Sequence, residues 1–404
     1  MNYITIICIL NIILIMILVI LYIHKQKFKN HFWNTWEEPK TFTILNSFNK
    51  LPVTHNNIRK STGLGKDFDV YLHILGQDTH IEEKCYMNNW NRTCIWCLQQ
   101  QSTLLCIEHL PAKNIGKDIT RLVFIPNQEL VTVSDEYVLI HSPILEYILC
   151  KNNYTFNIFN SFKRKHNCKW SVIEFNFPPI VKQPFLEYGK NRHIFLHSAG
   201  KSWMKNTSLV IETWREHPEW PFLVVSCADE CLKRHTTGED TSNIIIYDFL
   251  NSNQINKLQK HAGYSICPSA CEGFGHSLYE AMANGNVLIT GDIPPINEYI
   301  NDKNAIVINA YKEHLLGHKS ENMKFVESLS SEIGESGSAC FEFRKIDLEF
   351  AIQNAINMTD SEYVSLQNNA FNDWKHFVKQ GLHSTESALN AAGFTSNLKT
   401  CWIP

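Results

Sequence analysis

The chain has 404 residues, of which 44% are hydrophobic and 19% charged, and its formal net charge is −3 at pH 7. This length predicts two domains of ordinary size, each with ample hydrophobic core. The slightly acidic balance argues against a nucleic-acid-binding protein. The sequence also shows no internal repeat or low-complexity tract, which argues against a solenoid.

The N-terminus predicts a membrane anchor. Residues Ile4–Ile23 are apolar apart from Thr5 and Asn11, and about 20 apolar residues can cross a bilayer. No basic residues precede this run and no small-residue cleavage site follows it, so a retained anchor is favoured over a signal peptide; a buried helix is the alternative. Three lysines follow within 24–29. By the positive-inside rule they predict a single-pass protein whose large domain is cytosolic.

The cysteine count agrees with a reducing compartment. There are 13 cysteines, an odd number without regular pairing. Cys85, Cys94, Cys97 and Cys106 lie close together, and Cys94 and Cys97 form one C-x-x-C. A structural zinc site normally uses two close pairs of ligands. Buried free thiols are therefore favoured here, with disulfides and zinc as alternatives.

After an anchor and basic flank at 1–30, we expect a first domain at 31–185. Runs rich in β-branched and aromatic residues predict its strands, and a helix-like segment at 143–150 follows the last of them. The expected strands are 41–46, 69–75, 102–109, 122–129 and 136–142. Short strands that alternate with helices indicate a parallel sheet.

A Pro-rich segment at 176–184 connects to a second domain, expected at 186–345. Its first strand, at 193–197, leads into a loop that contains Lys201 and Lys205, and a helix then runs through Glu216. Further strands are expected at 222–226, 243–247, 263–269 and 286–290, with a helix at 256–262 and a surface loop at 320–337. The terminal region, 346–404, has helical periodicity, and the family resemblance given below implies that it packs back on the domains.

The most informative stretch, Cys271–Gly285, reads CEGFGHSLYEAMANG and joins the strand at 263–269 to a helix. Gly273 and Gly275 allow positive φ and a close approach of the backbone to a ligand. The helix start offers unpaired N–H groups and the positive end of the helix dipole, which suit a phosphate. With Glu272 and Glu280 beside it, this arrangement is typical of a nucleotide-sugar site.

The stretch resembles the retaining GT-B glycosyltransferases of the glycosyltransferase family 4, or glycosyl transferases group 1, type. Their signature is E-G-F-G-x-x-x-x-E-A-M-A-x-G, and almost every position is present here in the same order. The segment Gly200–Asn206 resembles a second pattern of the family, G-[RK]-x-x-x-K-G. Asn206 replaces its last glycine, and Asn tolerates positive φ better than most residues. The segment 291–299 resembles the family's P-x-x-E.

The resemblance implies an α/β GT-B fold, here preceded by one N-terminal transmembrane helix. Two Rossmann-like domains would face a cleft and transfer a sugar, with retained configuration and without a metal, from a UDP- or GDP-sugar. It further implies that Glu280 binds the donor ribose and that Glu272 contacts the donor sugar as a catalytic residue. The donor phosphates would be held by Lys201, Lys205, Gly273, Phe274, Gly275 and His276. The nucleotide sugar is a co-substrate, and no other cofactor is expected.

Two features of the first domain are assigned by the same resemblance. Relatives place a glycine loop opposite the donor phosphates, and Gly63 and Gly65 could form it, with a plain turn as the alternative. Relatives also place a histidine at the end of a middle strand, against the donor sugar. His109 is the first candidate for this catalytic position and His141 the second, although either could be a hydrogen-bonded structural histidine.

Other functions remain open on sequence alone. The chain could be an inactive glycosyltransferase-like membrane partner, a sugar-nucleotide-binding or lectin-like module, or a phosphorylase of the same fold. Asp67-Phe68-Asp69 is formally the D-x-D that binds a metal in another glycosyltransferase fold, but we interpret it as the entry to a strand. The acceptor, whether glycan, lipid or protein, is not indicated.

Overall fold

The structure is a computed structural model. It describes residues 63–75, 80–87, 92–111, 117–181, 184, 190–200, 202–227, 243–247, 250, 252–315 and 339–396. The proposed anchor Ile4–Ile23, the strand expected at 41–46, the loop at 320–337 and Lys201 all lie outside these residues. Within the part that is described, no helix is both long enough and apolar enough to cross a membrane.

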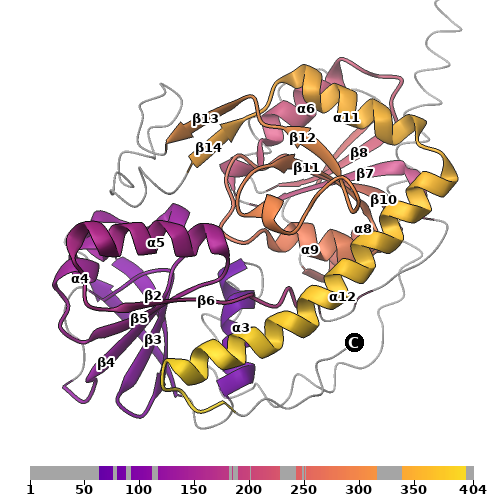
Figure 1. Cartoon of the computed structure of the whole chain (residues 1–404). Coiled ribbons are helices and arrows are strands. Elements are labelled where there is room, and N and C mark those ends of the chain that lie inside the picture. Colours follow the sequence, from indigo (N-terminus) through magenta and orange to yellow (C-terminus); the bar gives the residue numbers. More distant parts are fainter. Residues whose placement is uncertain are drawn as a thin grey trace, which may run out of the picture.

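Two six-stranded sheets form the centres of the two domains (Figure 1). The first sheet has the order β1-β2-β3-β4-β5-β6. Its strands are β1 (His80–Met87), β2 (Arg92–Gln100), β3 (Thr103–Ile107), β4 (Arg121–Ile125), β5 (Leu145–Cys150) and β6 (Ser171–Glu174). From β3 to β6 the pairing is parallel, as expected, but β1 and β2 extend the sheet in antiparallel register, which the sequence reasoning did not predict. Its helices are α3 (Gly63–Leu75), α4 (Val133–His141) and α5 (Asn153–His166).

The second sheet is parallel throughout and has the order β12-β11-β10-β7-β8-β9. Its strands are β7 (Asn191–Gly200), β8 (Phe222–Cys227), β9 (Ile244–Tyr247), β10 (Ala262–Cys267), β11 (Val287–Asp292) and β12 (Ile306–Asn309), and a small hairpin, β13 (Lys312–Leu315) and β14 (Ala339–Glu342), stands beside them. The helices of this half are α6 (Thr207–Arg215), α8 (Ser252–His261), α9 (His276–Ala283), α11 (Lys345–Asn357) and α12 (Asp360–Ala391). Central strands such as β10 are buried along their whole length, which explains their near-continuous apolar sequence. All the strands and helices expected between 193 and 290 are present.

The strand expected at 69–75 is wrong, because this segment belongs to helix α3. Its composition favours a strand, but the buried side chains Phe68, Tyr71, Ile74 and Leu75 recur at helical spacing. Asp67-Phe68-Asp69 is consequently part of a helix and does not begin a strand.

The elements expected at 136–142 and 143–150 are exchanged in the structure, where the first is helix α4 and the second strand β5. A capping box begins α4: the Thr132 side chain accepts from the Asp135 N–H, and the Asp135 carboxylate accepts from the Thr132 N–H. This local pair initiates a helix in a segment whose apolar composition also suits a strand.

Helix α12 connects the two domains, as the sequence predicts. It has 32 residues and runs from the second domain to the first (Figure 1). The Trp374 indole donates to the Pro179 carbonyl at 2.7 Å, and the Asn176 N–H donates to the Ser384 hydroxyl at 2.9 Å. At the far end, the Arg121 guanidinium donates to the Ala392 carbonyl at 3.2 Å. The helix therefore packs along the connection between the domains and ends on the first sheet.

The cysteines of the first sheet face one another in pairs. Cys85 is opposite Cys94 across β1 and β2, and Cys97 is opposite Cys106 across β2 and β3. Cys97 and Cys106 are buried and form no disulfide, with 3.6 Å between their sulfur atoms. No group of three or more metal-ligating side chains occurs in the described ranges.

Gly381 tests how tightly α12 packs on the connecting segment. A Cβ at this position would lie 2.6 Å from the Pro178 Cα. We expect Gly381→Ala to destabilise the protein by about 1–3 kcal/mol through overpacking, although alanine is the better helix former. The thermal unfolding midpoint should fall by several degrees. Ser387→Ala, at an exposed position of the same helix, should leave the midpoint unchanged or raise it, and equal effects of the two substitutions would contradict this packing.

Candidate functional site

The two domains meet at the carboxyl ends of their parallel strands. Gln128 follows β4, and its side-chain amide donates to the Glu272 carbonyl at 3.1 Å. Asn152 follows β5 and donates in the same way to the Gly273 carbonyl at 3.2 Å. Glu272 and Gly273 follow β10 of the second sheet. Open α/β sheets bind ligands in the crevice beyond these strand ends, so this is where the candidate site lies.

Lys205 and Glu272 form an ion pair in this crevice. The lysine ammonium also donates to the Ser277 hydroxyl at 3.2 Å, next to the start of α9. Burial alone would lower the pKa of Lys205, but the charge and hydrogen bond of Glu272 outweigh it and raise that pKa above its usual value. Lys205 is therefore positively charged at neutral pH and lies beside a helix N-terminus. Asn206, the next residue, has φ of 53°, which confirms that it fills the left-handed position of the usual glycine.

The second glutamate of the motif, Glu280, forms an ion pair with Lys66 of helix α3. The contact crosses between the domains, because Glu280 lies on α9. Gly275, immediately before this helix, has φ of 90° and allows the tight entry that the sequence predicts. The carboxylate expected to hold a ribose is thus already paired with a cation from the first domain.

Asp67 is the most buried charged group at the junction. Its carboxylate is 2.8 Å from the Lys151 ammonium and 2.6 Å from His276 Nε2, the first residue of α9. Burial alone would raise the pKa of Asp67, but the charges and hydrogen bonds of Lys151 and His276 hold it below its usual value. Lys151 also donates to the Asn127 side chain. Asp67 thereby joins α3, the end of β5 and the start of α9.

Glu298, from the P-x-x-E segment, caps a helix of the opposite domain. It accepts hydrogen bonds from the backbone N–H of Asn153 at 3.0 Å and of Tyr154 at 2.6 Å, at the start of α5. A carboxylate is stabilised there by the helix dipole. Burial nevertheless raises the pKa of Glu298 above its usual value.

Gly273 and Phe274 have packing roles that the motif did not predict. The backbone at Gly273 does not have positive φ. A side chain at this position would instead collide with the carboxyl group of Glu129. The Phe274 ring is buried against Phe177 and Tyr279, at centroid distances of 5.0 and 4.9 Å. Gly273 thus permits close domain contact and Phe274 anchors the loop, while their expected phosphate contacts remain predictions.

The residues expected from the first domain have mixed outcomes. His109 follows β3, as expected, and its Nδ1 is 3.0 Å from the Asp135 carboxylate. Burial would lower the pKa of His109, but Asp135 and Glu108 raise it above its usual value. His141 is wrong as a strand-end candidate, because it is exposed at the end of helix α4. Gly63 and Gly65 lie in the first turn of α3 and not in a loop, while their expected position opposite the donor phosphates stays a prediction.

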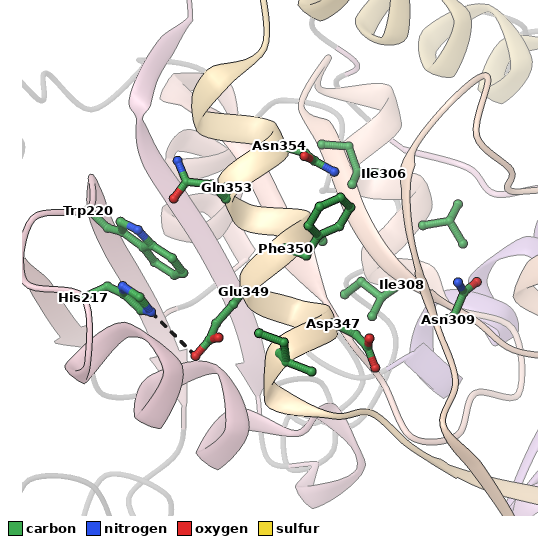
Figure 2. A pocket seen from close by; sticks show the side chains of 13 residues that line it. His217, Trp220, Ile306, Ile308, Asn309, Asp347, Glu349, Phe350, Gln353 and Asn354 are labelled. Carbon is green, nitrogen blue, oxygen red and sulfur yellow. Dashed lines mark ion pairs between the residues drawn. The ribbon is translucent and has the colours of Figure 1, made fainter.

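A groove of about 550 Å³ lies elsewhere, between α11, β12 and the turn that follows α6 (Figure 2). His217 and Glu349 face each other across it at 3.6 Å. Its described lining includes Asp347 and Glu349 but no lysine or arginine. A diphosphate would thus find no described lysine or arginine in the lining of this groove, whereas Lys205 lies in the crevice.

The family model "Glycosyl transferases group 1" matches residues 182–335. The chain contains a glycosyltransferase domain. No curated protein matches the sequence significantly. The match covers the second sheet together with Lys205, Glu272 and Glu280, and the two-domain α/β architecture is GT-B-like, as expected. We refer to this part as the group 1 domain.

Several solved structures are distantly similar to this chain. The pneumococcal O-GlcNAc transferase GtfA, in complex with UDP and GlcNAc, is 13% identical over 67% of this chain and 52% of its own, with a TM-score of 0.46. TarM is 12% identical over 70% of this chain and 52% of its own, with a TM-score of 0.48. WaaG, a glycosyltransferase involved in lipopolysaccharide biosynthesis, is 13% identical over 68% of this chain and 78% of its own, with a TM-score of 0.46. The chain spans about half the length of the first two, and these similarities are too weak to support a particular substrate.

Sequence reasoning missed the residues of the first domain that contact the group 1 domain. They are Lys66, Asp67, Gln128, Glu129, Lys151 and Asn152. Four of them lie within four residues after the buried strands β4 and β5, and polar residues that follow apolar runs are a recognisable signal. Lys66 and Asp67 were hidden because their helix was taken for a strand.

Asp67 provides a test of the junction. Replacing Asp67 by Asn would leave the Lys151 ammonium buried, with its side chain only 3% exposed, and facing a neutral group. We expect a loss of about 3–5 kcal/mol of stability, because one partner of a buried pair is removed. Asp360→Asn, which breaks an exposed pair with Arg192, should cost about 1 kcal/mol or less. Comparable thermal shifts for the two variants would show that Asp67 does not stabilise the junction.

Proposed function

We propose that the chain is a membrane-anchored glycosyltransferase that moves a sugar from a UDP- or GDP-sugar to an acceptor, with retained configuration and without a metal. The arrangement of Lys205, Glu272 and Glu280 around the start of α9 carries this proposal. One cation, one helix N-terminus and two carboxylates converge there, on the face of the group 1 domain that meets the first domain. A diphosphate and the hydroxyl groups of two sugars require this combination of partners.

The chemistry of the leaving group explains the cation. When the sugar leaves, negative charge grows on the nucleoside diphosphate, and a nearby positive group stabilises it. Lys205 is held in place by Glu272 and Ser277, and Ser277 lies in the first turn of α9, where a helix N-terminus favours an anion. Lys201 would add a second cation. The closed junction would exclude water, which favours transfer over hydrolysis.

The carboxylates would supply specificity for the donor. Glu280 would accept hydrogen bonds from the ribose hydroxyls and Glu272 from the donor sugar. Both are now paired with lysines, so a bound donor exchanges these ion pairs for its own groups. His109, fixed by Asp135 at 3.0 Å, would contact the donor sugar from the first domain.

The membrane part of the proposal depends on residues 4–23, which would hold the domains at the cytosolic surface of a membrane. Lysines that follow the apolar run support this orientation. A lipid-linked or membrane-bound glycan acceptor would fit an enzyme held at that surface.

Donor binding tests the proposal directly. The full-length protein in detergent should be stabilised against heat by one UDP- or GDP-sugar. Glu280→Gln and Lys205→Ala should each weaken that donor about 10- to 100-fold, because each removes a hydrogen bond to a charged group. Titration calorimetry would give the affinities.

Lys345→Ala is the matched control, because this lysine is exposed and pairs with Glu216 on another part of the surface. Its donor affinity should equal that of the wild type. If no nucleotide sugar binds a folded wild-type protein, the chain is better explained as an inactive membrane partner.

A further inference from the structure

Glu129 is a carboxylate of the candidate site that no family pattern assigns. It lies in the short 3-10 turn Gln128–Leu130, beyond the end of β4. Its carboxyl group covers the Cα of Gly273, the residue after Glu272, so closely that any side chain at 273 would collide with it. The first domain therefore inserts a carboxyl group into the centre of the motif of the group 1 domain.

The position of Glu129 is fixed by its neighbour. The Gln128 side chain donates to the Glu272 carbonyl at 3.1 Å and accepts from the Thr155 hydroxyl at 2.8 Å. Gln128 is itself 1% exposed. The turn is consequently attached to both domains, and the Glu129 side chain has little freedom to move away.

One oxygen of the carboxyl group lacks a partner. Glu129 is only 9% exposed, and its Oε2 makes no hydrogen bond to any described residue. A buried acceptor without a partner is destabilising, and such groups are rare in folded proteins. An acceptor left open beside Glu272 is suited to a ligand that brings its own donor.

Burial leaves this group near its midpoint at neutral pH. Burial, with smaller contributions from the carboxylates Glu272 and Glu108, raises the pKa of Glu129 to about 7, although a hydrogen bond from its own backbone N–H and the charge of Lys151 lower it. Cys271 is the other titratable neighbour. A carboxyl group with a raised pKa loses stabilising free energy as the pH rises through about 7, because ionisation is disfavoured in the folded state.

We propose that Glu129 recognises a sugar hydroxyl group in the crevice, and that its open Oε2 accepts the hydroxyl hydrogen. This inference rests on the proposed function and adds a specificity residue from the first domain. The hydroxyl belongs either to the donor sugar or to a sugar acceptor, because both would meet beside Glu272. A site built to hydrogen-bond a hydroxyl also rejects sugars that lack it at that position, since its buried acceptor would stay unpaired.

The test compares a nucleotide with its nucleotide sugar in the full-length protein. Glu129→Gln keeps the shape of the side chain but removes its charge. If the donor sugar is the ligand, the variant should bind UDP or GDP as the wild type does, yet bind the corresponding nucleotide sugar about 10- to 100-fold more weakly. If the acceptor is the ligand, donor affinity should be unchanged and the KM for acceptor should rise by the same factor.

The pH provides a readout that a structural role would not change. In the wild type, the ratio of the affinity for the nucleotide sugar to the affinity for the nucleotide alone should increase as the pH rises through about 7, because an ionised carboxylate accepts a hydrogen bond better than a protonated one. In Glu129→Gln this increase should be absent. The variant should also unfold at a higher temperature than the wild type above that pH, because the buried charge is gone, which establishes that it folds.

Glu219→Gln, on the exposed surface, is the matched control and should change neither affinity nor pH dependence. The inference is overturned if Glu129→Gln has wild-type affinity for nucleotide sugar and acceptor over the whole pH range. Failure of the wild type to bind any nucleotide would instead refute the proposed function, so the two failures are distinguishable.

Discussion

The structure depends on one buried carboxylate, Asp67, placed between a cation of its own domain and a histidine of the other. Removing a carboxylate from water is unfavourable by several kcal/mol unless charged partners surround it. Lys151 belongs to the same domain as Asp67, but His276 supplies its part only when the two domains are in contact. The same contact brings Lys66 to Glu280 and Gln128 to the Glu272 carbonyl. Electrostatics at a single residue therefore favours the closed arrangement in which the candidate site is complete.

The sequence was sufficient for the group 1 domain and insufficient for the first domain, for a physical reason. Around Glu272 and Glu280, neighbouring residues determine the local structure: a strand, a glycine with positive φ and the start of a helix. These are readable from neighbouring residues. In the first domain, the segment 133–150 has apolar composition compatible with either element, and the Thr132–Asp135 capping box was the only local sign of a helix. The roles of Asp67 and Glu129 depend on residues more than 100 positions away, which one sequence does not place.

Without a donor, the charged groups of the site neutralise one another. Lys205 pairs with Glu272, and Lys66 pairs with Glu280, so neither carboxylate stands unpaired in a crevice that is partly closed to water. Such pairing avoids the penalty of isolated buried charge. Among the described carboxylates of the site, Glu129 has a buried oxygen without a hydrogen-bond partner. The ion pairs therefore lower the cost of burying charge at the site, while Glu129 retains an acceptor for a further hydrogen bond.

The packing of α12 on the connecting segment also determines how the domains can move. In the described part of the chain, two segments pass between the domains: residues 175–181, and α12, which at 32 residues is about 48 Å long. Trp374 and Gly381 hold these two passages against each other at Pro178 and Pro179. Because both passages touch along one strip, a rotation about that strip stretches neither of them, whereas sliding one domain past the other would strain both. A rotation about this strip would be the domain motion that strains the two passages least, and it would separate Glu298 from the start of α5.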